Sequence, residues 1–161
     1  MQNASINFNY FLVSYGYMKI MKKDECRSCC PLAGALDILG DRWTLLVIRD
    51  MLFMGKHEYS EFMSGDEKIA TNILADRLKG LVCLDIINFR SHPKHKTKKL
   101  YYATQKGKDL LPLLVEMIIW GGTHCPAPDM PRERVAKLRR DPKKFIRSRL
   151  DELSAWEKTN L

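Results

Sequence analysis

The chain has 161 residues, of which 45% are hydrophobic, so it is long enough and apolar enough to fold around a single core. This composition excludes an intrinsically disordered chain. No apolar run approaches the roughly 20 residues that a membrane-spanning helix needs, so we expect no membrane partner.

The net charge of +8 is distributed unevenly along the sequence. Residues 1–66 carry seven Lys and Arg against eight Asp and Glu, whereas residues 86–108 carry seven Lys and Arg and no acid. Residues 131–149 carry nine Lys and Arg against two acids. Such separation favours a polyanionic partner, and a basic face that contacts only water is the alternative for either cluster taken alone.

The first 25 residues show no clear helical or strand period, and we expect a poorly ordered N-terminal tail. They lack the basic start of a secretory signal, and a later start at Met18 or Met21 is also compatible with the sequence. The chain has five cysteines. An odd number of cysteines without a secretory signal predicts reduced thiols and a cytoplasmic protein.

The next segment is predicted to form two helices. Apolar residues at helical spacing predict a helix over residues 31–40, which Gly40 stops. Asp41 then caps a second helix that ends at Gly55.

Residues 58–64 and 70–82 are predicted as a short helix and a longer helix. The turn between them, residues 65–68, contains Gly65. Two helices joined by a turn of three or four residues with a glycine are typical of a helix-turn-helix.

Two alternating stretches predict a β-hairpin over residues 86–103. Ile87 and Phe89 share one face of the first strand, and Leu100 and Tyr102 share one face of the second. The segment between the strands is a basic tip. The predicted fold class is therefore mainly α-helical with a small β-hairpin wing, a winged helix-turn-helix.

One long apolar helix is predicted after the hairpin, over residues 104–120, capped by Thr104 and kinked at Pro112. Its apolar residues lie nearly all round, and such a helix must be buried on every side. A domain of this size can seldom bury the helix alone, so we infer a homodimer in which a second copy covers it.

Beyond the last core helix, residues 126–131 have the composition of a linker. Residues 132–156 contain one or two amphipathic helices split near Pro142. The chain therefore divides into a tail (1–25), a winged helix-turn-helix domain (26–125) and a linker with a basic helical extension (126–161). The role of the extension is left open by the sequence.

The helix at 70–82 places polar side chains opposite its apolar side, and these are Thr71, Asn72, Asp76 and Lys79. Asn can pair with adenine, Asp can accept from cytosine, and Thr can contact a base edge, as reading of the DNA major groove requires. The solvated face of an ordinary amphipathic helix is the alternative. The order of short helix, turn, polar-faced helix and basic hairpin favours base reading.

The nearby cations are assigned to the DNA backbone. Arg77 lies closer to the apolar edge of the helix, so a neighbouring carboxylate or a phosphate is its expected partner. In the hairpin we assign four side chains to phosphates: Arg90, Lys94, Lys96 and Lys98. Such contacts supply the part of the affinity that does not depend on sequence.

Several short motifs stand in a fixed order between about Cys30 and His124. They are Cys30-Pro31, Gly40 with Trp43 and Thr44, Leu74 with Arg77 and Leu78, Thr104 with Gly107, and Trp120-Gly121. In these residues the sequence closely resembles the HxlR-type winged helix-turn-helix transcriptional regulators, relatives of the MarR group. The resemblance implies a homodimer, assembled through the N-terminal and last core helices, on a pseudo-palindromic operator in double-stranded DNA.

The sequence departs from the family pattern at both ends of the helix at 70–82. The family usually has Glu-x-x-Gly-Leu after this helix, and here Val82 and Asp85 stand at the Glu and Gly positions. Asp tolerates a left-handed conformation better than most residues do. Ala70 stands where many members have a capping Ser, so either Thr71 caps the helix or its start is uncapped.

The resemblance also implies a candidate redox sensor, because several family members sense oxidants or electrophiles through a cysteine at the position of Cys30. Cys30 precedes a helix that opens with Pro31, and a helix N-terminus stabilises a thiolate. Cys26 and Cys29 are close enough in sequence to form a disulfide with the oxidised residue. Ordinary reduced thiols are the alternative.

Zinc is a further alternative for these cysteines. Cys26 and Cys29 have ligand-like spacing, and Cys30, His124 or Cys125 would have to complete the site. The chain has no second Cys-x-x-Cys motif and no His-x-x-x-His motif. We therefore predict no metal site and no cofactor.

No pattern of a catalytic site is present in the sequence, neither a phosphate-binding loop nor a Gly-x-Ser-x-Gly motif, so we predict that the protein is not an enzyme. Two other functions stay open. One is a regulator that responds to a small ligand in a pocket at the dimer interface, without cysteine sensing. The other is a DNA-binding protein without sequence preference.

Overall fold

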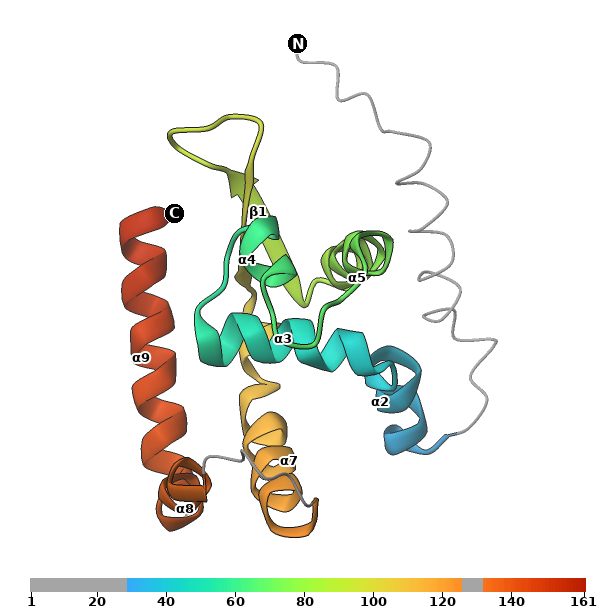
Figure 1. Cartoon of the computed structure of the whole chain (residues 1–161), viewed down its shortest axis with the longest axis vertical. Coiled ribbons are helices and arrows are strands. Elements are labelled where there is room, and N and C mark those ends of the chain that lie inside the picture. The colour runs from blue at the N-terminus through green and yellow to red at the C-terminus, as the bar shows by residue number, and fades with distance from the viewer. Residues whose placement is uncertain (1–28, 126–131) are drawn as a thin grey trace.

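The structure is a computed structural model that describes residues 29–125 and 132–161 (Figure 1). In chain order its elements are α2 (Pro31–Leu39), α3 (Arg42–Met54), α4 (Tyr59–Met63), α5 (Thr71–Cys83), β1 (Ile87–Ser91), β2 (Lys99–Ala103), α6 (Gln105–Lys108), α7 (Leu111–His124), α8 (Arg132–Arg140) and α9 (Pro142–Asn160). In the described residues β1 and β2 form one antiparallel hairpin. The predicted fold class, mainly α-helical with a small hairpin wing, is confirmed.

Helix α3 runs through the middle of the molecule, and the other elements are arranged around it (Figure 1). Helices α4 and α5 and the hairpin lie on one side of α3, whereas α2 and α7 lie on the other side. The core joins the apolar side of α3 to those of α5, β1 and α7. Its fully buried side chains include Ile48, Met51, Leu52, Leu74, Leu78, Ile87 and Leu111.

Both ends of α3 are fixed by the residues that the sequence indicates. The Asp41 carboxylate accepts hydrogen bonds from the backbone N–H groups of Trp43 and Thr44, at 3.0 and 3.1 Å. Gly55 ends the helix in the left-handed conformation, with φ of 66°. Gly40 ends α2 for another reason: a Cβ atom there would lie 2.4 Å from the carbonyl oxygen of Leu36.

The chain leaves α5 through a left-handed residue, Asp85, with φ of 54°. This residue stands where the family usually has glycine, and it adopts the left-handed conformation that Asp tolerates better than most residues do. The hydroxyl of Thr104 donates to the Asp85 carbonyl oxygen at 2.6 Å and caps α6 by accepting from the backbone N–H of Gly107. A Cβ atom on Gly107 would lie 2.1 Å from the carbonyl oxygen of Ile86, so only glycine fits.

On its second strand the hairpin faces the core with Tyr101 and Ala103, whereas Leu100 and Tyr102 share the other face, as the alternation predicts. Phe89 pairs with Tyr101 and Ile87 with Ala103, so these four side chains share the core face. Leu100 and Tyr102 lie on the opposite face. Leu100 is nevertheless buried, because it pairs with Glu58 beside α4.

The predicted single helix over 104–120 is wrong at Pro112. The structure ends α6 at Lys108 and begins α7 at Leu111, so Pro112 lies in the first turn of a new helix and does not kink an existing one. Proline is favoured in the first turn because its missing N–H group has no partner to lose there. The new helix runs beyond the predicted end, to His124.

The C-terminal extension forms two helices that meet at Asp141, as the position of Pro142 predicts. Helix α9 packs beside α3: Leu153 enters the core and the Phe53 and Phe145 rings stack at 5.6 Å. Farther along, the ring of Trp156 stacks on that of His57, with centroids 3.4 Å apart. The extension is thus part of the folded unit.

The stacked His57 ring is buried, and its Nδ1 lies 2.8 Å from the carbonyl oxygen of Tyr101 on β2. Burial lowers the pKa of His57 below its ordinary value of 6.5 and so favours the neutral ring. Because the unfolded chain binds this proton more readily, the stability that neutral His57 supports is lost as the pH falls below about 6.5.

We expect the substitution Asp85→Gly to raise the free energy of unfolding by about 1 kcal/mol, because glycine adopts a left-handed conformation without the Cβ strain. Chemical denaturation at neutral pH measures the change. Asp109→Gly is the matched control, since Asp109 has φ of −65° and glycine there should lower stability. A loss of stability in Asp85→Gly would contradict the assignment of strain to this residue.

Candidate nucleic-acid interface

One side of α5 is buried and the opposite side carries the four predicted base-reading residues. Leu74, Leu78 and Leu81 are at most 2% exposed and fix this helix in the core. Thr71 and Asn72 are exposed at its start, whereas Asp76 and Lys79 are half-buried. The polar residues therefore stand on the side of α5 that faces away from the core, with the most exposed pair in the first turn.

No side chain of the described residues caps the start of α5, which is one of the two outcomes that Ala70 leaves open. The hydroxyl of Tyr59 on α4 donates to the carbonyl oxygen of Thr71 at 2.8 Å and so holds the first turn against the preceding helix. Backbone N–H groups in the first turn of a helix carry partial positive charge and bind anions such as phosphate.

Arg77 forms ion pairs with two carboxylates. Its Nε lies 2.9 Å from Asp41 Oδ1, and its Nη1 lies 3.2 Å from Asp76 Oδ2. A carboxylate partner is one of the two that the sequence suggests for Arg77, and its contact with a DNA phosphate stays a prediction. The pair with Asp41 joins α5 to the first turn of α3, and the pair with Asp76 holds a predicted base reader.

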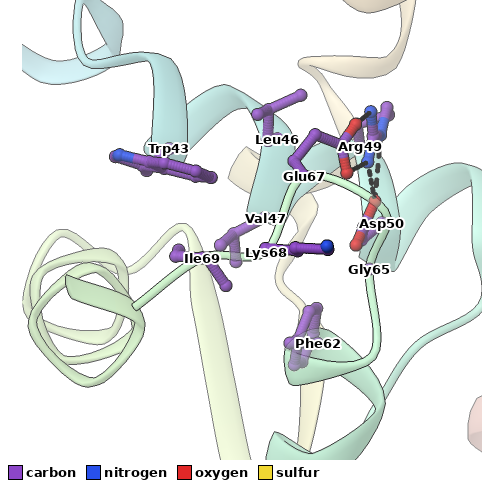
Figure 2. A pocket seen from close by; sticks show the side chains of 10 residues that line it. All are labelled: Trp43, Leu46, Val47, Arg49, Asp50, Phe62, Gly65, Glu67, Lys68 and Ile69. Carbon is purple, nitrogen blue, oxygen red and sulfur yellow. Dashed lines mark hydrogen bonds and ion pairs between the residues drawn. The ribbon is translucent and has the colours of Figure 1, made fainter. Parts of the chain in front are cut away.

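The turn of the helix-turn-helix is tied to α3 by charged side chains (Figure 2). The Arg49 guanidinium bridges Glu67 in the turn and Asp50 on α3. Lys56 Nζ contacts the other oxygen of the buried Asp50 carboxylate at 2.7 Å. Beside this network the apolar side chains of Trp43, Val47, Phe62 and Ile69 line a cavity of about 20 Å³, room for a single water molecule.

The charged groups in this network shift each other's pKa values. The hydrogen bond from Arg49 lowers the pKa of Glu67 to about 2, and its partners raise the pKa of Arg49. Since the folded-state pKa of Glu67 is depressed, its stabilising effect is complete above about pH 4.5 and is lost as the pH falls toward 2. The geometry of the turn is therefore constant at neutral pH.

The wing residues that are predicted to contact phosphates differ in exposure and in whether an acidic side chain pairs with them. Lys94 and Lys96 are exposed at the tip, and Arg90 is half-buried on β1. Lys98 Nζ lies 2.9 Å from Glu58 Oε2, and this hydrogen bond lowers the pKa of Glu58. Lys94 and Lys96 are thus exposed, and within the described residues no ion pair involves either of them.

Lys99 is a residue that the sequence analysis did not assign. Its ammonium lies over the ring of Phe89, 4.0 Å from the centroid. Burial, and then the nearby charge of Lys79 on α5, lower the pKa of Lys99. The charge of Lys99 on the wing is therefore near enough to that of Lys79 for the two to repel each other. The place of Lys99 over Phe89 follows from the strand register, and the sequence alone does not distinguish this lysine from the other cations of the hairpin.

A shallow groove of about 440 Å³ lies where the wing meets α4. Its walls carry hydroxyl and ammonium groups from Tyr59, Ser60, Thr97, Lys98 and Lys99, together with the ring of Tyr101 and the Glu58 carboxylate that pairs with Lys98. The groove is therefore of mixed charge, and only its ammonium and hydroxyl groups suit a phosphate backbone.

Two exposed apolar stripes lie on the side of α3 away from the wing. Leu32 and Leu36 on α2 are 67% and 57% exposed. On α7 the stripe consists of Leu113, Met117 and Trp120, which is 63% exposed. Their spacing of three and four residues puts each stripe on one face of its helix. Apolar area of this kind marks an interaction surface.

Among the candidate sensor cysteines, Cys29 and Cys30 are both exposed, and Cys30 is the N-cap residue of α2. Cys26 lies outside the described residues, so the structure does not test its pairing with either. Within residues 29–125 and 132–161 no group of three His, Cys, Asp or Glu side chains could hold a metal ion. In the same residues no helix is both long and apolar enough to cross a bilayer.

The model of the HxlR-like helix-turn-helix family matches residues 38–129, more than half of the chain. The chain belongs to this family. It is 31% identical over 97 residues to the HTH-type transcriptional regulator YodB of Bacillus subtilis, a match that covers 60% of this chain and 86% of that protein. It is 30% identical over 97 residues to the HTH-type transcriptional regulator MT3179 of Mycobacterium tuberculosis, a match that covers 60% of each chain. This HxlR-like chain thus spans about 60% of the length of that relative.

Solved structures of transcription regulators share the fold of this HxlR-like protein. PA1607, a candidate transcription factor, aligns with a TM-score of 0.57 and 36% identity over 65% of this chain and 71% of its own. Reduced YodB of Bacillus subtilis aligns with a TM-score of 0.50 and 31% identity over 63% of this chain and 100% of its own. A SlyA-like regulator of Listeria monocytogenes aligns with a TM-score of 0.50 over 100% of this chain and 98% of its own, and at 15% identity it supports the fold alone.

Proposed function

We propose that this HxlR-like protein is a sequence-specific transcriptional regulator that binds double-stranded DNA as a homodimer in the cytoplasm. The observation that carries the proposal is the side of α5 that faces away from the core, where Thr71 and Asn72 stand exposed in the first turn. The core holds the other side of the helix, and the first turn of a recognition helix usually makes the base contacts.

In this proposal α5 enters the major groove. The Asn72 amide pairs with an adenine, Thr71 contacts a base edge, and Lys79 donates to a guanine or a nearby phosphate. Asp76 accepts from a cytosine with the carboxylate oxygen that Arg77 leaves uncontacted. Arg77, beside its pairs with Asp41 and Asp76, contacts a phosphate of the DNA backbone.

The wing supplies the affinity that does not depend on sequence. Lys94, Lys96 and Lys98 at its tip, with Arg90 on β1, contact phosphates or the minor groove beside the recognition helix. Exposed cations of this kind release counterions from DNA when they bind, so the affinity should fall steeply with salt.

The apolar stripes on α2 and α7 support the homodimer. A second copy could cover both stripes, Leu32 and Leu36 on α2 and Met117 and Trp120 on α7. The free energy gained would be roughly proportional to the apolar area that is buried. A two-fold interface places the two α5 helices in successive major grooves, which requires an operator with pseudo-palindromic half-sites.

Control by thiol oxidation at Cys30 is supported by the exposure of this residue at the start of α2, next to exposed Cys29. Its place on α2 puts it beside the proposed dimer interface, so a disulfide with Cys26, Cys29 or a cysteine of the second copy would change how the two α5 helices are spaced. A small-ligand inducer that acts without this thiol is the competing mode of control.

The proposal is tested by an anisotropy titration of the reduced protein with DNA from upstream of its own gene, beside a scrambled duplex of equal length at two salt concentrations. Tighter binding to the upstream duplex at both concentrations supports sequence-specific regulation. Equal, steeply salt-dependent binding to every duplex tried would favour the nonspecific alternative.

Replacing Asn72 with Ala should weaken specific binding by about 1–3 kcal/mol and relax the sequence preference, because one bidentate base contact is lost. Competition between the preferred duplex and single-base variants measures both effects. Gln105→Ala removes an exposed amide from α6 and is the matched control, with no expected change. Lys96→Gln provides the contrast: it should weaken binding to all sequences and lower the salt slope by about 1. An unchanged preference in Asn72→Ala would refute the assignment of the reading face.

Introducing a charge at Trp120 should convert the dimer to a monomer, since Trp120→Glu places a carboxylate in each half of an apolar interface. Light scattering after size exclusion gives the mass directly. Met54→Glu is the control, because Met54 is 59% exposed on α3 and lies outside both stripes. A Trp120→Glu protein that keeps the mass of the wild type would place the dimer interface elsewhere.

If Cys30 is the sensor, a thiol oxidant should weaken operator binding of the wild type at least tenfold, with recovery after reduction, and should leave Cys30→Ser unaffected. The same anisotropy assay measures this change. Cys125→Ser, at another exposed cysteine, should respond as the wild type does. If the oxidant also releases the Cys30→Ser variant from the operator, the Cys30 thiol is not required for the response.

A further inference from the structure

Four exposed cations gather where α8 meets α9, and their charges have no role in the function proposed above. They are Arg140, Lys143, Lys144 and Arg147, which we call the basic corner. Lys143, Lys144 and Arg147 are three and four residues apart and therefore share one face of α9. Within the described part of the chain, no ion pair involves any of the four.

The stability of the fold does not favour this arrangement of charges. Lys143 and Lys144 lie in the first turn of α9, where the helix dipole is positive and cations are unfavourable. No acid lies in that turn, and the capping carboxylate of Asp141 is engaged by the backbone N–H of Lys144 at 2.9 Å. Like charges this close also repel one another. A partner of opposite charge would relieve both effects.

The corner is presented by a fixed scaffold. Val135 of α8 packs directly on Gly122 of α7, where a Cβ atom would come within 2.6 Å of its side chain. The Arg139 guanidinium donates to the hydroxyl of Thr123, one residue farther along α7. On the α9 side, the stacked Phe53 and Phe145 rings attach the first turns to α3.

The basic corner lies at the opposite end of the molecule from the wing. Along the longest axis, α8 is at one end, at the foot of α9, and the tip of the hairpin is at the other end (Figure 1). A straight duplex that lies on α5 and the wing therefore does not contact the corner of the same protomer. The match to the family ends at residue 129, before α8, so the corner is an addition to the shared domain.

The chemistry of the corner suits a nucleic-acid backbone better than a protein or a lipid surface. None of the exposed large apolar side chains in the described residues lies in α8 or the first turns of α9. The core of a protein interface is typically aromatic or apolar, and a helix that lies on a membrane needs an exposed apolar face. A row of Arg and Lys without such groups is sufficient for phosphates.

We propose that the basic corner binds the phosphate backbone of a second segment of duplex DNA, without sequence preference, while α5 and the wing hold the first. The protein then bridges two DNA segments. The inference rests on the proposed function, because the first segment is the one that α5 reads.

A bridging assay tests this directly with the full chain. A biotinylated duplex on beads carries the sequence that the protein selects from a random library, and a dye-labelled duplex of random sequence is in solution. The wild type should retain the dye on the beads. The variant with Arg140→Gln, Lys143→Gln, Lys144→Gln and Arg147→Gln should retain at least tenfold less dye, yet bind the bead duplex within twofold of the wild type.

Two controls separate charge from folding. Exchanging Arg for Lys and Lys for Arg at the same four positions preserves the charge and should preserve bridging. The Gln variant should unfold at the same temperature as the wild type or a higher one, because it removes cations from a helix N-terminus. A labelled poly-glutamate peptide is run beside the random duplex.

Four outcomes would overturn the proposal: no bridging by the wild type, equal bridging by the Gln variant, an equal loss of bead binding and bridging in that variant, or capture of poly-glutamate without bridging. The last would assign the corner to an acidic protein. If selection returns no preferred sequence, the beads carry random duplex. The proposed function then fails by itself, while bridging and its loss in the Gln variant still decide the role of the corner.

Discussion

One carboxylate joins the central helix α3 to α5. Asp41 accepts the first hydrogen bonds of α3 and also pairs with Arg77 of α5 at 2.9 Å. The same side chain therefore contacts the start of the central helix and α5, whose other side Leu74, Leu78 and Leu81 hold in the core. Because Arg77 also contacts Asp76 at 3.2 Å, this constraint reaches the polar face that is proposed to read DNA.

Other motif residues of the family also act through geometry. Thr104 caps α6 and donates a hydrogen bond to the turn after α5. Because Gly107 of α6 has no side chain, the backbone of that turn can pack directly against α6. The Arg49–Glu67 pair fixes the turn before α5 against α3. Thr104, Gly107 and the Arg49–Glu67 pair thus hold α5 at both ends, whereas a residue that would choose an operator, such as Asn72, is exposed. One scaffold can in this way present different reading faces.

The elements with local signals could be predicted from the sequence. A capping Asp and a final Gly fix α3 to within a residue, and the left-handed Asp85 follows from its place in the family pattern. The break before α7 could not be predicted in this way, since Pro112 is compatible with a kink as well as with a first turn. Its outcome depends on Gly107 packing against Ile86 and on the burial of Leu111, which are contacts between distant segments.

The same limit applies to the candidate site. The polar face of α5 follows from helical periodicity alone, but the place of Lys99 beside Lys79 depends on the strand register, and the partner of Arg77 depends on how α3 and α5 pack. The docking of α9 on His57 has no local signal at all, because an aromatic pair 99 positions apart (57 and 156) leaves no period in the sequence.

Whether α5 reads a DNA sequence can be decided by selection from a library of random duplexes with the purified, reduced protein. We expect enrichment of a pseudo-palindromic sequence whose half-sites are separated by about one helical turn, roughly 10–10.5 base pairs from centre to centre, or a multiple of that spacing. Enrichment should disappear with Asn72→Ala. A library that shows no enrichment after several rounds, although the protein binds DNA in a salt-dependent way, would contradict sequence reading by α5.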